Sequence, residues 1–254
     1  MSQADWREQV PVLHGAHVDV REVRPEDALT LTSYLSDPSV ARYISTPPST
    51  PAAFQGFVGW AQRERAAGTM VCFAVAPRGS DRPVGIFQVR GLAPDFSTAE
   101  WGFALAAPFW GTGVFEDAAS LVAEFAFQTL GVHRLEARAV TLNDRGNGAL
   151  AKLGARGEAM LRGGLVAEGG RRDQFLWTLI ADEWRVRRRP SLRYSADATK
   201  RRIDEAILAC QRRMFGSDGA PRPADTFDRP FLIAGTRESA AAPSGVDFDI
   251  DPDR

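Results

Sequence analysis

Two closely spaced glycines, Gly111 and Gly113, separate a strand pattern from a helix pattern near the middle of the chain. The stretch before them, 98–105 (TAEWGFAL), is typical of a β-strand, and the stretch after them, about 116–130, repeats apolar residues at helical spacing. Another strand pattern follows at 133–140. Because two strands joined through one helix pair in parallel, this unit predicts a parallel pair inside a mixed α/β sheet.

The stretches on either side of this unit predict further strands and helices of the same domain. The expected elements are strands at 18–23, 70–76 and 84–90, helices at about 26–36, 52–67 and 146–153, a loop at 37–51, and a closing hairpin that pairs about 158–166 with 174–180. In the helix 52–67, the aromatic side chains of Phe54, Phe57 and Trp60 are expected to pack in the core.

Composition divides the chain into three segments. Residues 18 to about 183 look globular, with short turns between alternating elements. Residues 185–215 contain ten Lys or Arg against three Asp or Glu, which predicts a basic linker and helix. Residues 216–254 contain four Arg against eight Asp or Glu, with many Gly, Pro and Ala, which predicts an acidic, disordered tail.

Charge and residue usage narrow the classes of function. The formal net charge of the 254 residues is -1, so no whole-chain field attracts nucleic acid or a membrane. No apolar run is long enough to span a bilayer, and the start (MSQADWREQV) lacks the features of a signal peptide. Two Cys and three scattered His predict no metal site and a cytoplasmic, reducing environment.

The glycine turn is the strongest chemical feature of the sequence. The first N–H groups of the following helix lack helical partners, and the helix dipole adds partial positive charge, so the turn can bind a diphosphate. A tight turn without a ligand explains the two glycines alone equally well. The residues of the turn do not match a P-loop motif, since no Gly-Lys-Ser/Thr follows. They do not match a dinucleotide-binding motif either, since the third glycine is missing.

Four segments in order carry a resemblance to a known family. They are 99–103 (AEWGF), 108–113 (PFWGTG), 143–146 (NDRG) and 150–155 (LAKLGA). Together they resemble the GNAT-type N-acetyltransferase superfamily, and most closely its branch that acetylates N-terminal alanines of ribosomal proteins. The resemblance covers about residues 12–184. It implies an acetyltransferase domain with a mostly antiparallel, twisted α/β sheet whose central parallel pair is splayed between flanking helices.

The resemblance also implies which residues bind acetyl-coenzyme A. The backbone of Phe103, Ala104 and Leu105 would hydrogen-bond the pantetheine arm, and the Asn143 side chain would contact it. Amides of the turn would hold the phosphates; the matched residues are Gly111, Thr112, Gly113, Val114, Phe115 and Glu116. The sequence departs from the family pattern at Trp110, Phe115, Gly146 and Ala155, so a bulky ring stands beside the phosphate turn.

Glu100 is the candidate general base for the amine acceptor. In the strand 98–105 it shares a face with Gly102 and Ala104, where burial is expected to make its carboxylate a stronger base, acting directly or through a water. A carboxylate paired with an Arg across the sheet is the structural alternative. No Tyr lies between Tyr43 and Tyr194, so no general acid is assigned.

The acceptor is the open question. At pH 7, deprotonating an α-amine costs roughly 1.4 kcal/mol and a lysine roughly 4.6 kcal/mol, so a single Glu favours a protein N-terminal amine. A small amine, such as an aminoglycoside or polyamine, is the alternative within the enzyme class. A non-catalytic acyl-coenzyme-A-binding module is the alternative outside it. The basic segment 185–215 would dock on the domain or on the acidic tail, or it would recruit a protein or RNA partner. The sequence does not indicate the oligomeric state.

Overall fold

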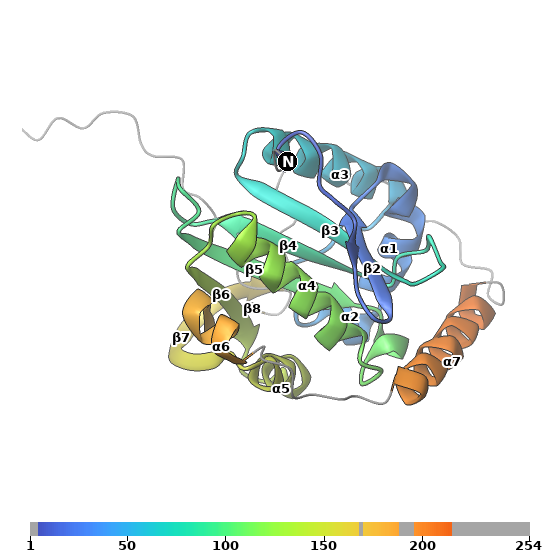
Figure 1. Cartoon of the computed structure of the whole chain (residues 1–254). Helices are drawn as coiled ribbons and strands as arrows, with labels where there is room; N and C mark the ends of the chain where they lie inside the picture. Colours follow the sequence, from blue (N-terminus) through green and yellow to red (C-terminus); the bar gives the residue numbers. More distant parts are fainter. Residues whose placement is uncertain (1–4, 168–169, 188–195, 215–254) are drawn as a thin grey trace, which may run out of the picture.

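The computed structural model of the chain describes residues 5–167, 170–187 and 196–214, and it shows one sheet between helices (Figure 1). The strands are β1 (Leu13–His14), β2 (Val18–Glu22), β3 (Met70–Pro77), β4 (Gly85–Gly91), β5 (Thr98–Leu105), β6 (Arg134–Val140), β7 (Arg156–Ala167) and β8 (Gly170–Ile180). The α-helices are α1 (Ala28–Leu35), α2 (Pro38–Ala41), α3 (Pro51–Ala66), α4 (Val114–Gln128), α5 (Asp144–Leu153), α6 (Ala181–Arg187) and α7 (Ala196–Met214), and the 3-10 helices are η1 (Pro25–Asp27) and η2 (Ala107–Phe109). The predicted tail, 216–254, lies outside the described residues.

The eight strands form one sheet in the order β1-β2-β3-β4-β5-β6-β8-β7. Neighbouring strands are antiparallel except for β5 and β6, which α4 connects and which run parallel. The predicted α/β fold, with its mostly antiparallel sheet and one central parallel pair, is confirmed.

The parallel pair separates soon after it forms. Its ladder joins Thr98–Glu100 of β5 to Arg134–Glu136 of β6 and stops there. Yet β5 continues along β4 as far as Leu105, and β6 continues along β8 as far as Val140. The carboxyl ends of the two strands therefore diverge, and the last residues of β5 have a backbone edge that β6 does not cover.

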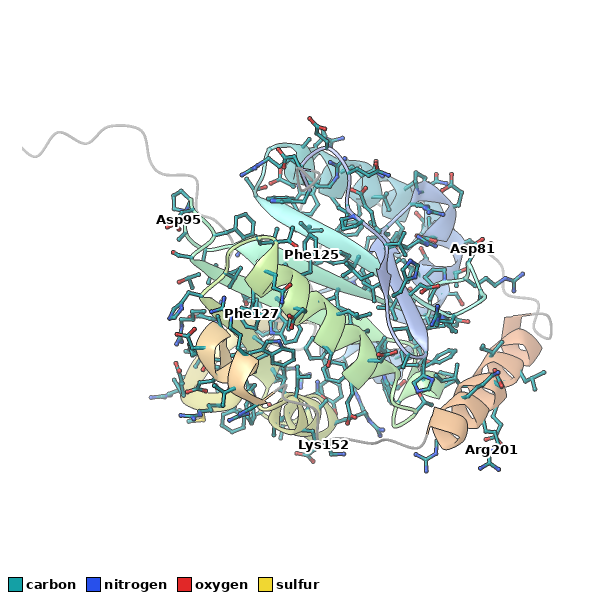
Figure 2. All side chains as sticks on the ribbon, viewed as in Figure 1. Asp81, Asp95, Phe125, Phe127, Lys152 and Arg201 are labelled. Atoms are coloured by element: carbon teal, nitrogen blue, oxygen red, sulfur yellow. The ribbon has the colours of Figure 1, made fainter. Side chains whose placement is uncertain are left out.

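Helices bury both faces of the sheet. α4 crosses one face (Figure 1), where Phe125 packs edge to face on Phe73 with ring centroids 5.3 Å apart (Figure 2). α1 and α3 lie on the other face and contribute Leu31, Phe54 and Phe57, all fully buried. The expected core role of the α3 aromatics holds for these two residues, whereas Trp60 is half-buried.

A carboxylate fixes the start of α4 to the edge of the sheet. Asp117, in the first turn of the helix, accepts hydrogen bonds from the backbone N–H groups of Ala16, His17 and Val18 at 3.2, 2.7 and 3.1 Å. Ala16 and His17 belong to the connection between β1 and β2, and Val18 is the first residue of β2. The glycine turn that precedes α4 is thus held between β5 on one side and this connection on the other.

Several short elements, η2 among them, were not expected from the sequence. The predicted loop 37–51 contains α2, which begins because the Asp37 side chain accepts from the Ser39 N–H at 2.9 Å. The two-residue β1 was also missed, as was α6, where the Trp184 indole donates to Glu124 at 2.7 Å. The α6 contact joins residues sixty positions apart, which local patterns do not reveal, whereas the α2 cap is a local signal that the interpretation of 37–51 as a loop overlooked. Within the described ranges, no helix is long and apolar enough to cross a membrane.

Candidate active site

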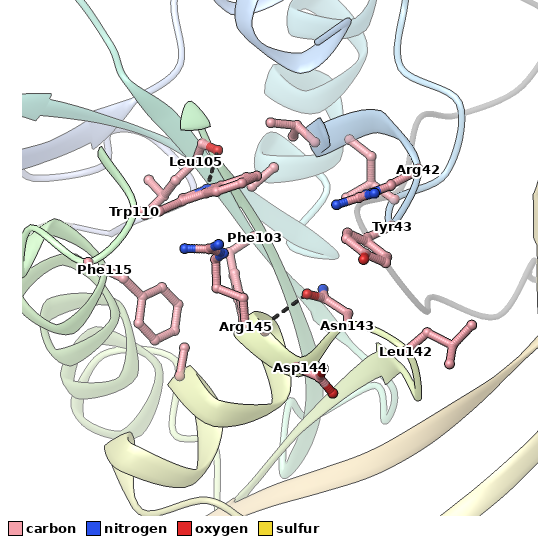
Figure 3. A pocket seen from close by; sticks show the side chains of 16 residues that line it. Arg42, Tyr43, Phe103, Leu105, Trp110, Phe115, Leu142, Asn143, Asp144 and Arg145 are labelled. Carbon is pink, nitrogen blue, oxygen red and sulfur yellow. Dashed lines mark hydrogen bonds between the residues drawn. The ribbon is translucent and has the colours of Figure 1, made fainter. Parts of the chain in front are cut away.

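A cavity of about 320 Å³ lies where β5 and β6 diverge (Figure 3). Its walls come from α2 and the loop after it, the end of β5, the turn before α4, and the start of α5. The lining residues are Val40, Arg42, Tyr43, Ile44, Phe103, Ala104, Leu105, Trp110, Gly111, Phe115, Leu142, Asn143, Asp144, Arg145, Gly146 and Ala149. Segments more than a hundred residues apart in the sequence therefore meet at one site.

The glycine turn adopts a backbone that other residues strongly disfavour. Gly111 and Gly113 have φ angles of 72° and 94°, in the left-handed region. Gly113 occupies the N-cap position of α4 and has no side chain with which to cap the helix. Thr112 between them is buried, and its hydroxyl donates to the Phe109 carbonyl at 2.7 Å. The Val114 N–H lies 3.5 Å from Thr112 Oγ1, but the N-cap residue itself makes no side-chain cap, so backbone donors at the start of α4 remain for an anion.

The contacts of Trp110 account for a tryptophan at this position, where the sequence departs from the family pattern. Its indole Nε1 donates to the Leu105 carbonyl at 3.0 Å, so the side chain ties the glycine turn to the last residue of β5. The Arg145 guanidinium lies over the Trp110 ring, 4.5 Å from its centroid (Figure 3). The ring therefore forms a rigid wall that places a positive charge in the cavity.

The end of β5 presents a free strand edge to the cavity. Phe103, Ala104 and Leu105 all line it and pair with β4 on their other side. A strand edge without a partner offers backbone N–H and C=O groups to an extended ligand. One of these acceptors, the Leu105 carbonyl, is already engaged by Trp110.

The Phe115 ring belongs to an aromatic cluster on the cavity wall. Its centroid lies 4.7 Å from that of Phe103 and 6.1 Å from that of Phe87. Phe87 in turn contacts Trp101, with centroids 5.9 Å apart. The bulky ring is accommodated by packing on β4 and β5, beneath the turn.

Asn143 connects β6 to the start of α5. Its side-chain Oδ1 accepts from the Gly146 N–H at 2.9 Å and so caps the helix. A Cβ atom at position 146 would lie only 2.5 Å from Asn143 Nδ2, so a side chain there would push against the residue that caps α5. The neighbouring Asn147 is structural: its Nδ2 donates to backbone carbonyls, and its Oδ1 accepts from Trp177 Nε1 at 2.9 Å.

Glu100 is fully buried where the parallel ladder ends. Its carboxylate lies 3.5 Å from Arg138 on β6 and 3.8 Å from Arg90 on β4. Two guanidinium groups therefore face the carboxylate, and burial lowers the pKa of Arg90. Glu100 is not among the residues that line the cavity. The ion pair across the sheet, the structural alternative to a catalytic base, is therefore present.

Several lining residues were missed by the sequence reasoning. Arg42 and Tyr43 follow α2, and Figure 3 shows them across the cavity from Arg145 and Phe103. The sequence offered no nearby tyrosine, yet the fold brings Tyr43 to the site from a distant loop. Only a correct placement of that loop against β5 could have identified it.

The structure gathers some, but not all, of the predicted site residues around the cavity. The lining includes Phe103, Ala104, Leu105, Gly111, Phe115 and Asn143. Thr112, Gly113, Val114 and Glu116 belong to the same turn and helix start but do not line it. No group of three or more His, Cys, Asp or Glu within the described ranges is placed to hold a metal ion.

A splayed parallel pair, a free strand edge and a glycine turn at a helix start meet at this cavity, and the family match makes the chain an acetyl-coenzyme-A-dependent acyltransferase. Residues 17–156, more than half of the chain, match the family described as "Acetyltransferase (GNAT) domain". The chain belongs to the GNAT acetyltransferase family.

Individual relatives agree with this assignment. The chain is 24% identical to the uncharacterized N-acetyltransferase p20 of Bacillus licheniformis over 173 residues, which cover 68% of this chain and 97% of the relative. Its fold is similar to that of the ribosomal-protein-S5-alanine acetyltransferase from Vibrio fischeri, with a TM-score of 0.63, 20% identity, and 69% and 99% of the two chains covered. It is equally similar to Mycobacterium smegmatis RimJ in complex with CoA-disulfide, with a TM-score of 0.63, 22% identity, and 82% and 97% covered.

Proposed function

We propose that this chain transfers the acetyl group of acetyl-coenzyme A to the N-terminal amine of a protein. The observation that carries the proposal is the cavity at the divergence of β5 and β6, which joins the glycine turn to the free edge of β5. The family assignment supports the coenzyme. The likeness to two structures, one named a ribosomal-protein-S5-alanine acetyltransferase and the other RimJ, supports the acceptor class. Two cysteines, of which Cys72 is buried and free, suit a cytoplasmic enzyme.

In this proposal each part of the cavity holds a different part of the coenzyme. The amides of Gly111 to Glu116 bind the diphosphate, because the helix start supplies unpaired donors and partial positive charge. Phe103, Ala104 and Leu105 align the pantetheine arm as an added strand. Asn143 keeps its Oδ1 on the α5 cap and donates from Nδ2 to a pantetheine carbonyl.

In this reaction the acceptor amine is the nucleophile, so the protein must position the two substrates and supply one proton acceptor. The acceptor nitrogen bonds to the thioester carbon, the carbon–sulfur bond breaks, and the amine proton leaves for a base. Glu100 is the proposed base. It lies three residues before Phe103, or about 10 Å along the strand, so the proton travels through water. The departing thiolate takes a proton from water.

The test of the activity is thiol release. The full-length chain is incubated with acetyl-coenzyme A and with either peptides carrying free N-termini, or aminoglycosides and polyamines. We expect release above the hydrolysis background only with peptides, and mass spectrometry should place the acetyl group on the α-amine. Turnover of small amines alone would contradict the acceptor class. Coenzyme binding without any turnover would instead indicate a non-catalytic acyl-coenzyme-A-binding module.

The role of Glu100 is tested by Glu100→Gln. If Glu100 is the base, kcat falls by about 10²- to 10⁴-fold, while the affinity for coenzyme A is unchanged. Glu136→Gln is the matched control, because Glu136 also faces Arg138, at 3.9 Å, and lies opposite Glu100 in the ladder. A purely structural Glu100 would give the opposite result: a lower melting temperature, because two buried guanidinium groups lose their partner, with kcat of the folded fraction retained.

A further inference from the structure

The basic helix α7 lies against the glycine turn. It packs on η2, and its Ile203 and Ala206, at helical spacing, are buried in the same core as Phe109. Figure 1 shows α7 apart from α1, α3 and α4, the helices that cover the sheet. The sequence left open whether the basic segment docks on the domain, and these contacts place the helix on it. They also place its charge near the turn.

One arginine of α7 reaches the turn itself. Arg202 Nη1 donates to the Gly111 carbonyl at 3.4 Å, and Gly111 lines the cavity. A guanidinium carries five N–H donors, and this contact uses one of them. The Arg202 side chain is exposed, so its remaining donors are accessible to a ligand at the turn.

The cavity lining carries little net positive charge, so a further cation would strengthen the binding of an anionic ligand. The lining contains two cations, Arg42 and Arg145, and one anion, Asp144. The first turn of α4 adds Glu116, which opposes an anion at the helix start, while Asp117 of that turn accepts three backbone hydrogen bonds beside β2. Coenzyme A carries three phosphate groups, so the described lining supplies little of the positive charge that such a ligand attracts.

We propose that Arg202 of α7 binds a phosphate of coenzyme A and that docking of α7 on η2 positions it there. This inference rests on the proposed function. It makes the C-terminal helix, which lies outside the matched residues 17–156, part of the coenzyme site. Arginine suits this role because its planar donors match phosphate oxygens.

The test is calorimetric titration of the full-length chain with coenzyme A and with pantetheine, which lacks the nucleotide. Arg202→Gln keeps an N–H donor for the Gly111 carbonyl but removes the charge. We expect about a five- to tenfold weaker affinity for coenzyme A, no change for pantetheine, and a shallower salt dependence of coenzyme A binding. If Arg202 only held the turn through the Gly111 carbonyl, Arg202→Gln would leave the salt dependence of coenzyme A binding unchanged.

Arg201→Gln is the matched control, because it removes the same charge from the same helix. Arg201 is exposed, and Figure 2 shows it on the side of α7 that faces away from the domain. We expect less than about a twofold change. Ala206→Asp, which places a charge in the contact with the domain, should match the loss caused by Arg202→Gln. Equal losses for Arg201→Gln and Arg202→Gln would overturn the proposal.

Dephospho-coenzyme A identifies the phosphate. If Arg202 binds the diphosphate, Arg202→Gln weakens dephospho-coenzyme A and coenzyme A alike; if it binds the 3′-phosphate, only coenzyme A is affected. Either result supports the proposal, whereas unchanged affinity for coenzyme A overturns it. Failure of the unmodified chain to bind coenzyme A would instead refute the proposed function, so the two failures are distinguishable.

Discussion

Two helices begin at the same cavity, and their first turns are satisfied in opposite ways. Asn143 is the N-cap residue of α5, and its side chain accepts from the Gly146 N–H. α4 begins at Gly113, which has a positive φ and no side chain to offer. Asn143 caps α5 from the N-cap position, whereas the N-cap residue of α4 offers no side chain and the Val114 N–H makes a longer contact, 3.5 Å, with Thr112 Oγ1. The difference indicates that the start of α4, not that of α5, is the one arranged for an external anion.

The acidic residues sharpen this contrast. Asp144 in the first turn of α5 lines the cavity, whereas Asp117 in the first turn of α4 is turned toward the β1–β2 connection, where it accepts three backbone hydrogen bonds. Its negative charge is thereby engaged by donors away from the turn. A carboxylate at a helix start therefore does not by itself exclude an anion there.

Of changes at the two helix starts, the largest effect on coenzyme affinity is expected from placing a side chain in the α4 turn. Gly111→Val puts a β-branched residue at a φ of 72°, on a wall of the cavity. We expect the affinity for coenzyme A to fall by about 10- to 30-fold, because the turn must distort by roughly 1–3 kcal/mol or leave its binding conformation. Isothermal titration calorimetry measures this loss.

Gly131→Val is the control for strain alone. Gly131 has a φ of 75° and, like Gly111, open space where a Cβ atom would lie, but it follows the far end of α4. Both variants should lose similar stability in thermal melts. Loss of coenzyme affinity in both would show that the turn has no special role.

A smaller effect is expected at the start of α5, where the Asn143 side chain is proposed both to cap the helix and to donate to the pantetheine arm. Asn143→Asp keeps an oxygen for the cap but loses the Nδ2 donor, so KM for acetyl-coenzyme A should rise about five- to tenfold with the melting temperature unchanged. Asn143→Ala loses both and should also lower the melting temperature by about 2–4 °C. If KM is unchanged in both variants, Asn143 is a cap and nothing more.

The sequence predicted the unit that builds the site better than it predicted the cavity. The strand, the two glycines and the amphipathic helix are local patterns, so β5, the turn and α4 could be found without a structure. Tyr43 and Arg42 reach the same cavity from α2, and no local pattern shows which loop will fold over the end of β5.

The role of Glu100 also depends on neighbours that are distant in the sequence. The face of the strand on which it lies follows from alternation, but its two arginine partners follow from register. Arg90 is opposite Glu100 on β4, and Arg138 lies two residues beyond its partner on β6. Whether a buried carboxylate is a base or an ion-pair partner depends on such neighbours. Sequence reasoning could name both roles but could not choose between them.

The most direct test of the difference between the two helix starts is the response of their backbone amides. Coenzyme A is titrated into uniformly ¹⁵N-labelled full-length chain, and amide chemical shifts are followed. We predict the largest shifts at residues 113–116, with much smaller shifts at Gly146 and Asn147, whose N–H groups already donate to Asn143. Saturable binding that moves the α5 amides and leaves 113–116 unchanged would contradict the account.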